Sequence, residues 1–124
     1  MISTEDRYEY IDLTYLINVA EGDESFVEET INTYLVSIPH EIKELKTAIS
    51  LGNCDQAAFH AHTLKGAFNF VGASRLADMC STLEDCCHAE DKKGKVPEII
   101  EQIEPLAAKA TAELHTVLSR MRHG

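Results

Sequence analysis

The sequence predicts an all-α fold, an up-down antiparallel four-helix bundle with a short extra helix at the N-terminus. Only 6 glycines and 3 prolines occur in 124 residues, which leaves little material for the turns of an all-β fold. Apolar residues also recur at intervals of three and four along most of the chain, as on the buried face of an amphipathic helix. Short connections make successive helices antiparallel neighbours, and this favours the up-down arrangement.

The first two predicted helices each follow an aspartate that is placed to cap them. Asp12 precedes a short helix over residues 13–20, and Asp23 precedes a long segment over residues 24–50. Pro39 falls inside the long segment, where we expect a kink and not a break, because the apolar spacing resumes directly after it. The apolar positions of this segment are Phe26, Val27, Ile31, Tyr34, Leu35, Ile38, Ile42, Leu45 and Ile49.

The third helix has a stop signal before it and another after it. Gly52 supplies a left-handed end for the preceding helix. Asn53 then caps the new helix, and Gln56 three residues later is the second half of a predicted capping box. The helix runs to about Phe70 and ends at Gly72.

Two more helices complete the predicted bundle. One begins near Ala73, and its core stripe consists of Leu76, Cys80, Leu83 and Cys87. The charged stretch EDKKGKV, residues 90–96, is expected to be a loop. Pro97 suits the first turn of the final helix, and Pro105 is a second candidate for a kink. The apolar stripe of the final helix includes Ile100, Ile103, Leu106, Leu114 and Leu118.

Length and charge bound the class of protein. The chain fits one domain over residues 1–124. A formal net charge of −10 disfavours nucleic acid and anionic membranes as partners, because both attract clustered Lys and Arg. The N-terminus lacks the apolar core of a signal peptide, and no run approaches the roughly 18 apolar residues of a membrane span. We therefore expect a free-standing cytoplasmic protein, and a monomer, since one bundle can use all the apolar stripes.

The cysteines are expected to be reduced. Cys54, Cys80, Cys86 and Cys87 show no C-x-x-C spacing and follow no secretory signal. Cys80 and Cys87 fall on the apolar stripe of a predicted helix, which indicates small core residues. We expect no metal site.

The outer face of the third helix carries the candidate site. The core stripe of this helix is Ala57, Ala61, Leu64 and Phe68. His62 lies about 100° from Ala61 around a helix of 3.6 residues per turn, so it projects away from the core. The residues that share its face are Phe59, His62, Lys65, Gly66 and Asn69.

The residue types on this face suggest a histidine that carries negative charge while it meets another protein. A neutral imidazole is a competent nucleophile, and Lys65, one turn along, can reach the outer nitrogen of His62 and neutralise a phosphoryl group there. A glycine inside a helix costs about 1 kcal/mol relative to alanine. Gly66 has a purpose if its missing side chain lets the active site of a partner close over His62.

These residues resemble the signature of histidine-containing phosphotransfer (HPt) domains. The resemblance rests on HTLKGA at residues 62–67, on VGA at 71–73, and on Leu76 and the Leu83-Glu84 pair. The segment 22–49 also resembles the N-terminal helices of that family, so the similarity covers roughly residues 12–90. The spacing of a glycine ten residues after the histidine makes the match more specific than H-x-x-K-G alone.

The resemblance implies a helical bundle that relays phosphoryl groups between receiver domains in multistep two-component signalling. His62 would be the phosphoacceptor, Lys65 the phosphate-stabilising residue and Gly66 the clearance residue. The partners would be response-regulator receiver domains or a hybrid sensor histidine kinase. The sequence has no Walker loop, no acidic metal cluster and no general base beside His62. We therefore expect a carrier without kinase or nucleotide-binding activity or a cofactor of its own, with Mg²⁺ supplied by the receiver.

Three positions near the motif need separate comment. Position 68 is usually small in the resembled family, and Phe68 on the core stripe is interpreted as a local repacking that leaves the site intact. Asn69 is a candidate for contact with the phosphoryl group or the partner, although a solvated side chain near a helix end is an equal alternative. Phe59 is a candidate docking residue on the same terms.

Other readings stay open at this point. A docking module that binds receivers without phosphotransfer is one, but such a domain is expected to lose the His or the Lys, and this chain keeps both. A metal-binding bundle that uses His60, His62 and His88 is another, although residues two apart on a helix lie about 160° apart. A kinase dimerisation helix pair has a His-Glu dipeptide, whereas Thr63 follows His62 here.

Overall fold

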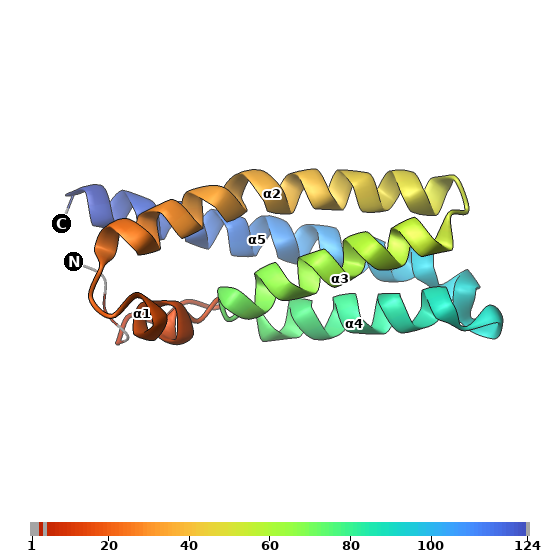
Figure 1. Cartoon of the computed structure of the whole chain (residues 1–124), viewed down its shortest axis with the longest axis horizontal. Coiled ribbons are helices and arrows are strands. Elements are labelled where there is room, and N and C mark those ends of the chain that lie inside the picture. Colours follow the sequence, from red (N-terminus) through yellow and green to blue (C-terminus); the bar gives the residue numbers. More distant parts are fainter. Residues whose placement is uncertain (1–2, 4, 124) are drawn as a thin grey trace.

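The computed structural model of the chain describes residue 3 and residues 5–123, and within this part it is all-helical (Figure 1). Four long helices lie lengthwise beside one another, each packs against the next in the chain, and the last closes the ring against the first. The predicted four-helix bundle with a short N-terminal helix is therefore confirmed. Its elements are α1 Thr14–Ala20, α2 Glu24–Ser50, α3 Cys54–Phe70, α4 Ser74–His88, the 3₁₀ helix η1 Glu90–Lys95 and α5 Val96–His123.

The cap predicted at Asp23 is present, whereas Asp12 lies one residue before the N-cap of α1, which is Leu13. The carboxylate of Asp23 accepts a hydrogen bond from the backbone N–H of Phe26 at 3.1 Å, and a cap of this kind stabilises a helix by about 1 kcal/mol. The carboxylate of Asp12 accepts from the backbone N–H of Thr14 at 2.9 Å, although the helix proper begins one residue later than predicted. The pKa of the Asp12 carboxyl is lowered, first by hydrogen bonding with the side chain of Thr14 and next by this backbone hydrogen bond, because both favour its charged form.

The predicted capping box at the start of α3 is only half correct. The side chain of Asn53 does accept from the backbone N–H of Gln56 at 3.1 Å. The backbone N–H of Asn53, which the Gln56 side chain was expected to satisfy, instead donates to the carbonyl oxygen of Ala48 at 2.9 Å. The last carbonyls of α2 have no partner within that helix, and the one of Ala48 is among them. In the tight turn between the two helices it therefore pairs with the N–H of Asn53.

Both internal prolines lie within continuous helices, Pro39 in α2 and Pro105 in α5. The predicted loop over residues 90–96 is wrong, because η1 forms there and α5 follows without a break. Bonds between residues three apart, such as the one from the N–H of Lys92 to the carbonyl of Ala89 at 2.9 Å, satisfy the backbone of this short connection.

The core runs along the axis of the bundle and follows the predicted stripes closely. All four stripe residues of α3 and of α4 are buried. Phe26 is an exception. Its ring remains exposed at the start of α2, whereas Val27 and Ile31 pack into the core. The largest fully buried side chains are Phe68, Leu16, Ile31, Ile38, Leu45, Leu64, Leu83, Ile103, Leu114, Val27, Val71 and Val117.

The N-terminal segment is held across the turn between α3 and α4. The backbone N–H of Asp12 donates to the carbonyl of Val71 at 3.0 Å. Gly72, next to it, has φ of +71°, and a Cβ added there would overlap the backbone carbonyl of Asp12. Earlier in the segment, the backbone N–H groups of Glu9 and Tyr10 each donate to the carboxylate of Glu113 on α5, at 2.7 Å. Gly72 is therefore required both by its backbone angle and by the close approach of the segment.

Within the described residues, no helix combines the length and the apolar character needed to cross a membrane.

Candidate functional site

His62 projects from the middle of α3 into solvent, as predicted. Its side chain is 70% exposed, whereas its neighbours Ala61 and Leu64 are fully buried. Because an α-helix repeats about every 3.6 residues, Ala61 and Leu64 face the core while His62 points away from it. Phe68, the residue that departs from the resembled family, is fully buried on the core side of α3, as expected.

A carboxylate from the neighbouring helix fixes the ring of His62. The Nδ1 atom of His62 lies 3.2 Å from Oε1 of Glu84, which is on α4 and whose side chain is 24% exposed. An ionised carboxylate only accepts hydrogen bonds, so Nδ1 must carry the proton in this pair. The proton at Nδ1 leaves the lone pair on Nε2, which is the outer ring nitrogen. A neutral imidazole in this tautomer can react as a nucleophile through Nε2.

The sequence places no carboxylate close to His62 along the chain. Glu84, which belongs to the resemblance without a role there, lies 22 residues away, yet the structure brings it to Nδ1 of His62. A signal for the contact exists in the predicted hairpin. His62 lies eleven residues before Ala73 and Glu84 eleven residues after it, and residues at equal distances from the turn meet across an antiparallel helix pair.

Within the described residues, no hydrogen bond joins Lys65 to His62. The Nζ atom of Lys65 donates to the hydroxyl of Ser81 on α4 at 3.4 Å, a long hydrogen bond that contributes little. Lys65 and Ser81 are also symmetric about Ala73, eight residues to either side. Ser81 and Glu84, three residues apart on α4, therefore form a row that faces Lys65 and His62 on α3.

Gly66 is exposed, and the space beside it is empty. A Cβ built at this position meets no atom within 4 Å. Nothing inside the described part of the protein therefore requires a glycine here, even though it weakens the helix by about 1 kcal/mol relative to alanine.

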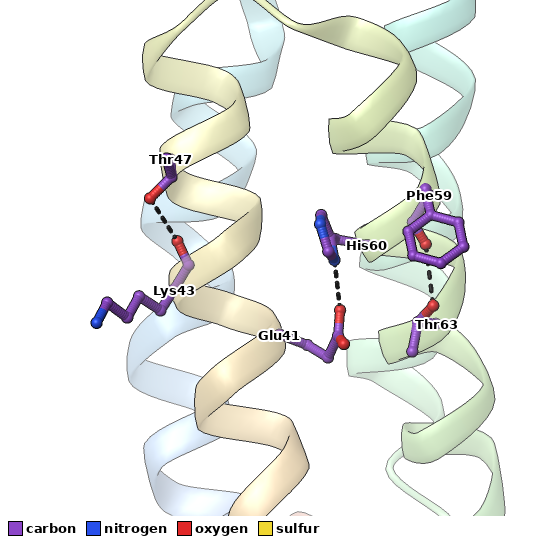
Figure 2. Close-up of polar contacts among 6 residues, drawn as sticks. All are labelled: Glu41, Lys43, Thr47, Phe59, His60 and Thr63. Carbon is purple, nitrogen blue, oxygen red and sulfur yellow. Dashed lines mark hydrogen bonds and ion pairs between the residues drawn. The ribbon is translucent and has the colours of Figure 1, made fainter.

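Phe59 and Asn69 lie at the two ends of the same face. The side chain of Phe59 is 62% exposed, its ring meets that of His60 edge-on at 5.2 Å, and its carbonyl accepts from the hydroxyl of Thr63 at 3.1 Å (Figure 2). Asn69 is exposed at the end of α3. It lies seven residues from His62, about 10 Å along the helix axis, which favours contact with a partner over contact with a group on His62.

His60, two residues before His62, belongs to a different part of the molecule. Its Nδ1 lies 2.6 Å from Oε2 of Glu41, and both side chains are largely buried between α2 and α3 (Figure 2). The pair ties these two helices together. Across the part of the chain that the structure describes, no three His, Cys, Asp or Glu side chains are arranged to hold a metal ion.

The comparisons with known proteins agree on one family. A family model described as Hpt domain matches residues 29–124. The phosphorelay intermediate protein rdeA of Dictyostelium discoideum is 23% identical over 96 residues, which are 75% of this chain and 38% of that protein. Histidine-containing phosphotransfer protein 2 of Arabidopsis thaliana is 29% identical over 79 residues, 61% of this chain and 51% of that protein. The chain thus spans about half or less of the length of these curated relatives.

A solved structure shares the fold. The crystal structure of histidine-containing phosphotransfer protein B (HptB) from Pseudomonas aeruginosa PAO1 superposes with a TM-score of 0.83 at 23% identity, and the match covers 92% of this chain and 98% of the other. At this identity the likeness establishes the arrangement of the helices.

Proposed function

The chain belongs to the Hpt domain family, and we propose that it carries phosphoryl groups between receiver domains in a phosphorelay, with His62 as the residue that is phosphorylated. The observation that supports this most directly is the exposed imidazole whose Nδ1 is held by Glu84. In this tautomer Nε2 carries the lone pair, and the empty space beside Gly66, where an added Cβ would meet no atom within 4 Å, supports the approach of a partner.

The proposed transfer is an in-line displacement. The lone pair on Nε2 of His62 attacks the phosphorus of an aspartyl phosphate on the receiver, the bond from phosphorus to the carboxyl oxygen breaks, and the aspartate leaves as a carboxylate. The ring keeps its proton at Nδ1 and gains positive charge, which the carboxylate of Glu84 stabilises at 3.2 Å. No base has to remove a proton from His62. The step runs in reverse by the same path, as a carrier requires.

Lys65 is proposed to stabilise the phosphoryl group once it is on His62. Its 3.4 Å hydrogen bond to Ser81 is weak enough to exchange for a contact with a phosphoryl oxygen. At an exposed site such an ion pair is worth about 1 kcal/mol or less. The lysine therefore tunes the lifetime and the rate more than it decides whether transfer happens.

The rest of the face is proposed to receive the partner. Gly66 leaves clearance beside His62, Phe59 offers exposed apolar area, and Asn69 offers a polar side chain at the far end. As an Hpt domain the chain is a phosphoryl carrier, and we propose that it has no kinase or nucleotide-binding activity and no cofactor of its own. The partner receiver, or the receiver of a hybrid sensor kinase, would hold the Mg²⁺ ion. We further propose a cytoplasmic monomer that binds neither nucleic acid nor membranes.

The test is to mix the protein with a phosphorylated receiver domain and Mg²⁺ and to follow the phosphoryl group. We expect a label on this chain that is labile in acid and stable in alkali, as for a phosphorus–nitrogen bond. The label should be lost in His62→Gln, and the helical content should not change. His115→Gln serves as the matched control, because His115 is an exposed histidine on α5. A label that persists in His62→Gln would move the site elsewhere.

The alternative reading is a docking module that binds receivers and transfers nothing. Binding of several receivers without any label would favour that reading over ours.

A further inference from the structure

A second group of reactive side chains lies at the end of the bundle where α3 begins and α4 ends. A cavity of about 280 Å³ opens there between the α2–α3 turn, the end of α4 and the start of α5. Its lining residues are Ala48, Ile49, Gly52, Asn53, Cys54, Ala57, Cys87, Lys93, Val96 and Pro97. Two thiols and one ammonium group thus border a single cavity, eight residues along α3 from His62 and about 12 Å away by helical rise.

The two thiols differ in access. Cys54, the first residue of α3, is partly exposed. Cys87, in the last turn of α4, is only 3% exposed, and among the described residues no hydrogen bond to its side chain is found. Burial raises the pKa of the Cys87 thiol to about 11, and the nearby Cys54 adds to the increase. A partly exposed thiol therefore lies near a buried thiol that forms no hydrogen bond within the described residues.

Two features of the surroundings of Cys54 bear on its chemistry. Cys54 is the first residue of α3, and a helix N-terminus is favourable for a nearby anion. Lys93 of η1 lines the same cavity and interacts electrostatically with Cys54. The pKa of Lys93 is raised, first by its hydrogen bond to Glu90 and next by Cys54. A lysine beside a cysteine at a helix start is the environment in which thiols exchange with disulfides.

We propose that Cys54 and Cys87 form a dithiol site that is oxidised by small disulfides. The thiolate of Cys54 attacks one sulfur of R–S–S–R, which forms a mixed disulfide on Cys54 and releases one R–S⁻. The thiol of Cys87 then loses its proton to solvent and attacks Sγ of Cys54, which forms the Cys54–Cys87 disulfide and releases the second R–S⁻. The protein loses two electrons and two protons, and the small disulfide is reduced to two thiols.

The other two cysteines provide the contrast. Cys86 and Cys80 are buried on α4 and do not line the cavity, and burial raises the pKa of Cys80 to about 12. Cys86 is the neighbour of Cys87 in the sequence and equally inaccessible, so it is the matched control. The proposal does not depend on phosphotransfer, and its test uses no receiver domain.

The experiment uses the full chain and 5,5′-dithiobis(2-nitrobenzoate), a small aromatic disulfide whose released thiolate is coloured. We expect two equivalents of thiolate per chain in a fast phase, and a product lighter by two hydrogen atoms in which peptide mapping links Cys54 to Cys87. Cys54→Ser should abolish the fast phase. Cys87→Ser should release one equivalent and retain the mixed disulfide, whereas Cys86→Ser should behave as the unsubstituted chain. Lys93→Met should slow the fast phase by roughly threefold to tenfold.

Other results would overturn the proposal. A disulfide requires Cβ atoms about 3.5–4.5 Å apart, so a stable mixed disulfide on Cys54 in the unsubstituted chain would show that Cys87 cannot reach it. Equal reactivity of all four cysteines, seen only as the protein unfolds, would show that the cavity confers no selectivity. A link to Cys86 in place of Cys87 would count against the assignment as well.

Discussion

The contact between His62 and Glu84 leads to a quantitative prediction about phosphotransfer. Replacing Glu84 by Gln keeps a carbonyl oxygen that can accept from Nδ1 and removes the negative charge, whereas Glu84→Ala removes both. A unit charge pair at about 4 Å is worth on the order of 4 kcal/mol at an effective dielectric of 20. The side chain of His62 is 70% exposed and that of Glu84 is 24% exposed, so solvent reduces this to about 1 kcal/mol.

One kcal/mol corresponds to roughly a fivefold change in a rate or equilibrium constant. We therefore expect Glu84→Gln to slow transfer from a phosphorylated receiver to His62 about fivefold. Glu84→Ala should slow it by about tenfold or more, because the ring also loses its orientation and its preferred tautomer. Rapid-quench measurements of labelled protein give the rates, and ¹⁵N NMR of the imidazole reports which nitrogen carries the proton.

The two readouts distinguish a specific role from a general loss of structure. Glu84→Ala should move the imidazole toward a mixture of tautomers, and a merely structural substitution would not. Asp85→Asn is the matched control, since Asp85 is the adjacent, exposed carboxylate on α4. Transfer by Glu84→Ala within twofold of the unsubstituted rate, with one tautomer retained, would refute the role that we assign to Glu84.

Three further predictions concern Lys65 and two glycines. Lys65→Ala should slow transfer or shorten the phosphohistidine lifetime by up to about fivefold without changing thermal stability, and an unchanged rate and lifetime would remove Lys65 from the site. Gly66→Gln should leave the fold intact or stabilise it by up to about 1 kcal/mol while it blocks transfer from the receiver; normal transfer would disprove the clearance role. Gly72→Ala should destabilise the fold by about 2 kcal/mol or more in denaturant unfolding, because of its positive φ and the overlap with Asp12. The control Gly52→Ala has a similar φ and open space around it, so an equal loss in both variants would show that the close approach is unimportant.

The helices and the outer face of α3 could be predicted from local sequence because their causes are local. The 3–4 spacing of Ala57, Ala61 and Leu64 determines which side of α3 is buried, and the position of His62 relative to this stripe follows from helical geometry alone. Asp23 and Asn53 cap their helices through contacts within three residues. Such contacts hold whatever the rest of the chain does.

The errors arose where a backbone group or a short segment had more than one possible partner. The N–H of Asn53 was available to the Gln56 side chain three residues away, but it pairs with Ala48 because the end of α2 offers an unpaired carbonyl. The segment over residues 90–96 has the composition of a loop, yet its backbone closes into η1 because both of its ends are anchored by helices. Amino-acid composition does not indicate which hydrogen-bond partner or which backbone conformation is more stable in such cases.

The helical class, the stripes of the core and an exposed histidine beside a lysine and a glycine can all be inferred from the sequence, since each depends on spacing along one chain segment. The surroundings of that histidine depend on how the helices pack. The antiparallel packing of α4 on α3 brings Glu84 to Nδ1 of His62 and turns Lys65 toward Ser81. The crossing of the N-terminal segment makes Gly72 indispensable. These contacts join residues many positions apart, and their geometry exists only once the helices have packed.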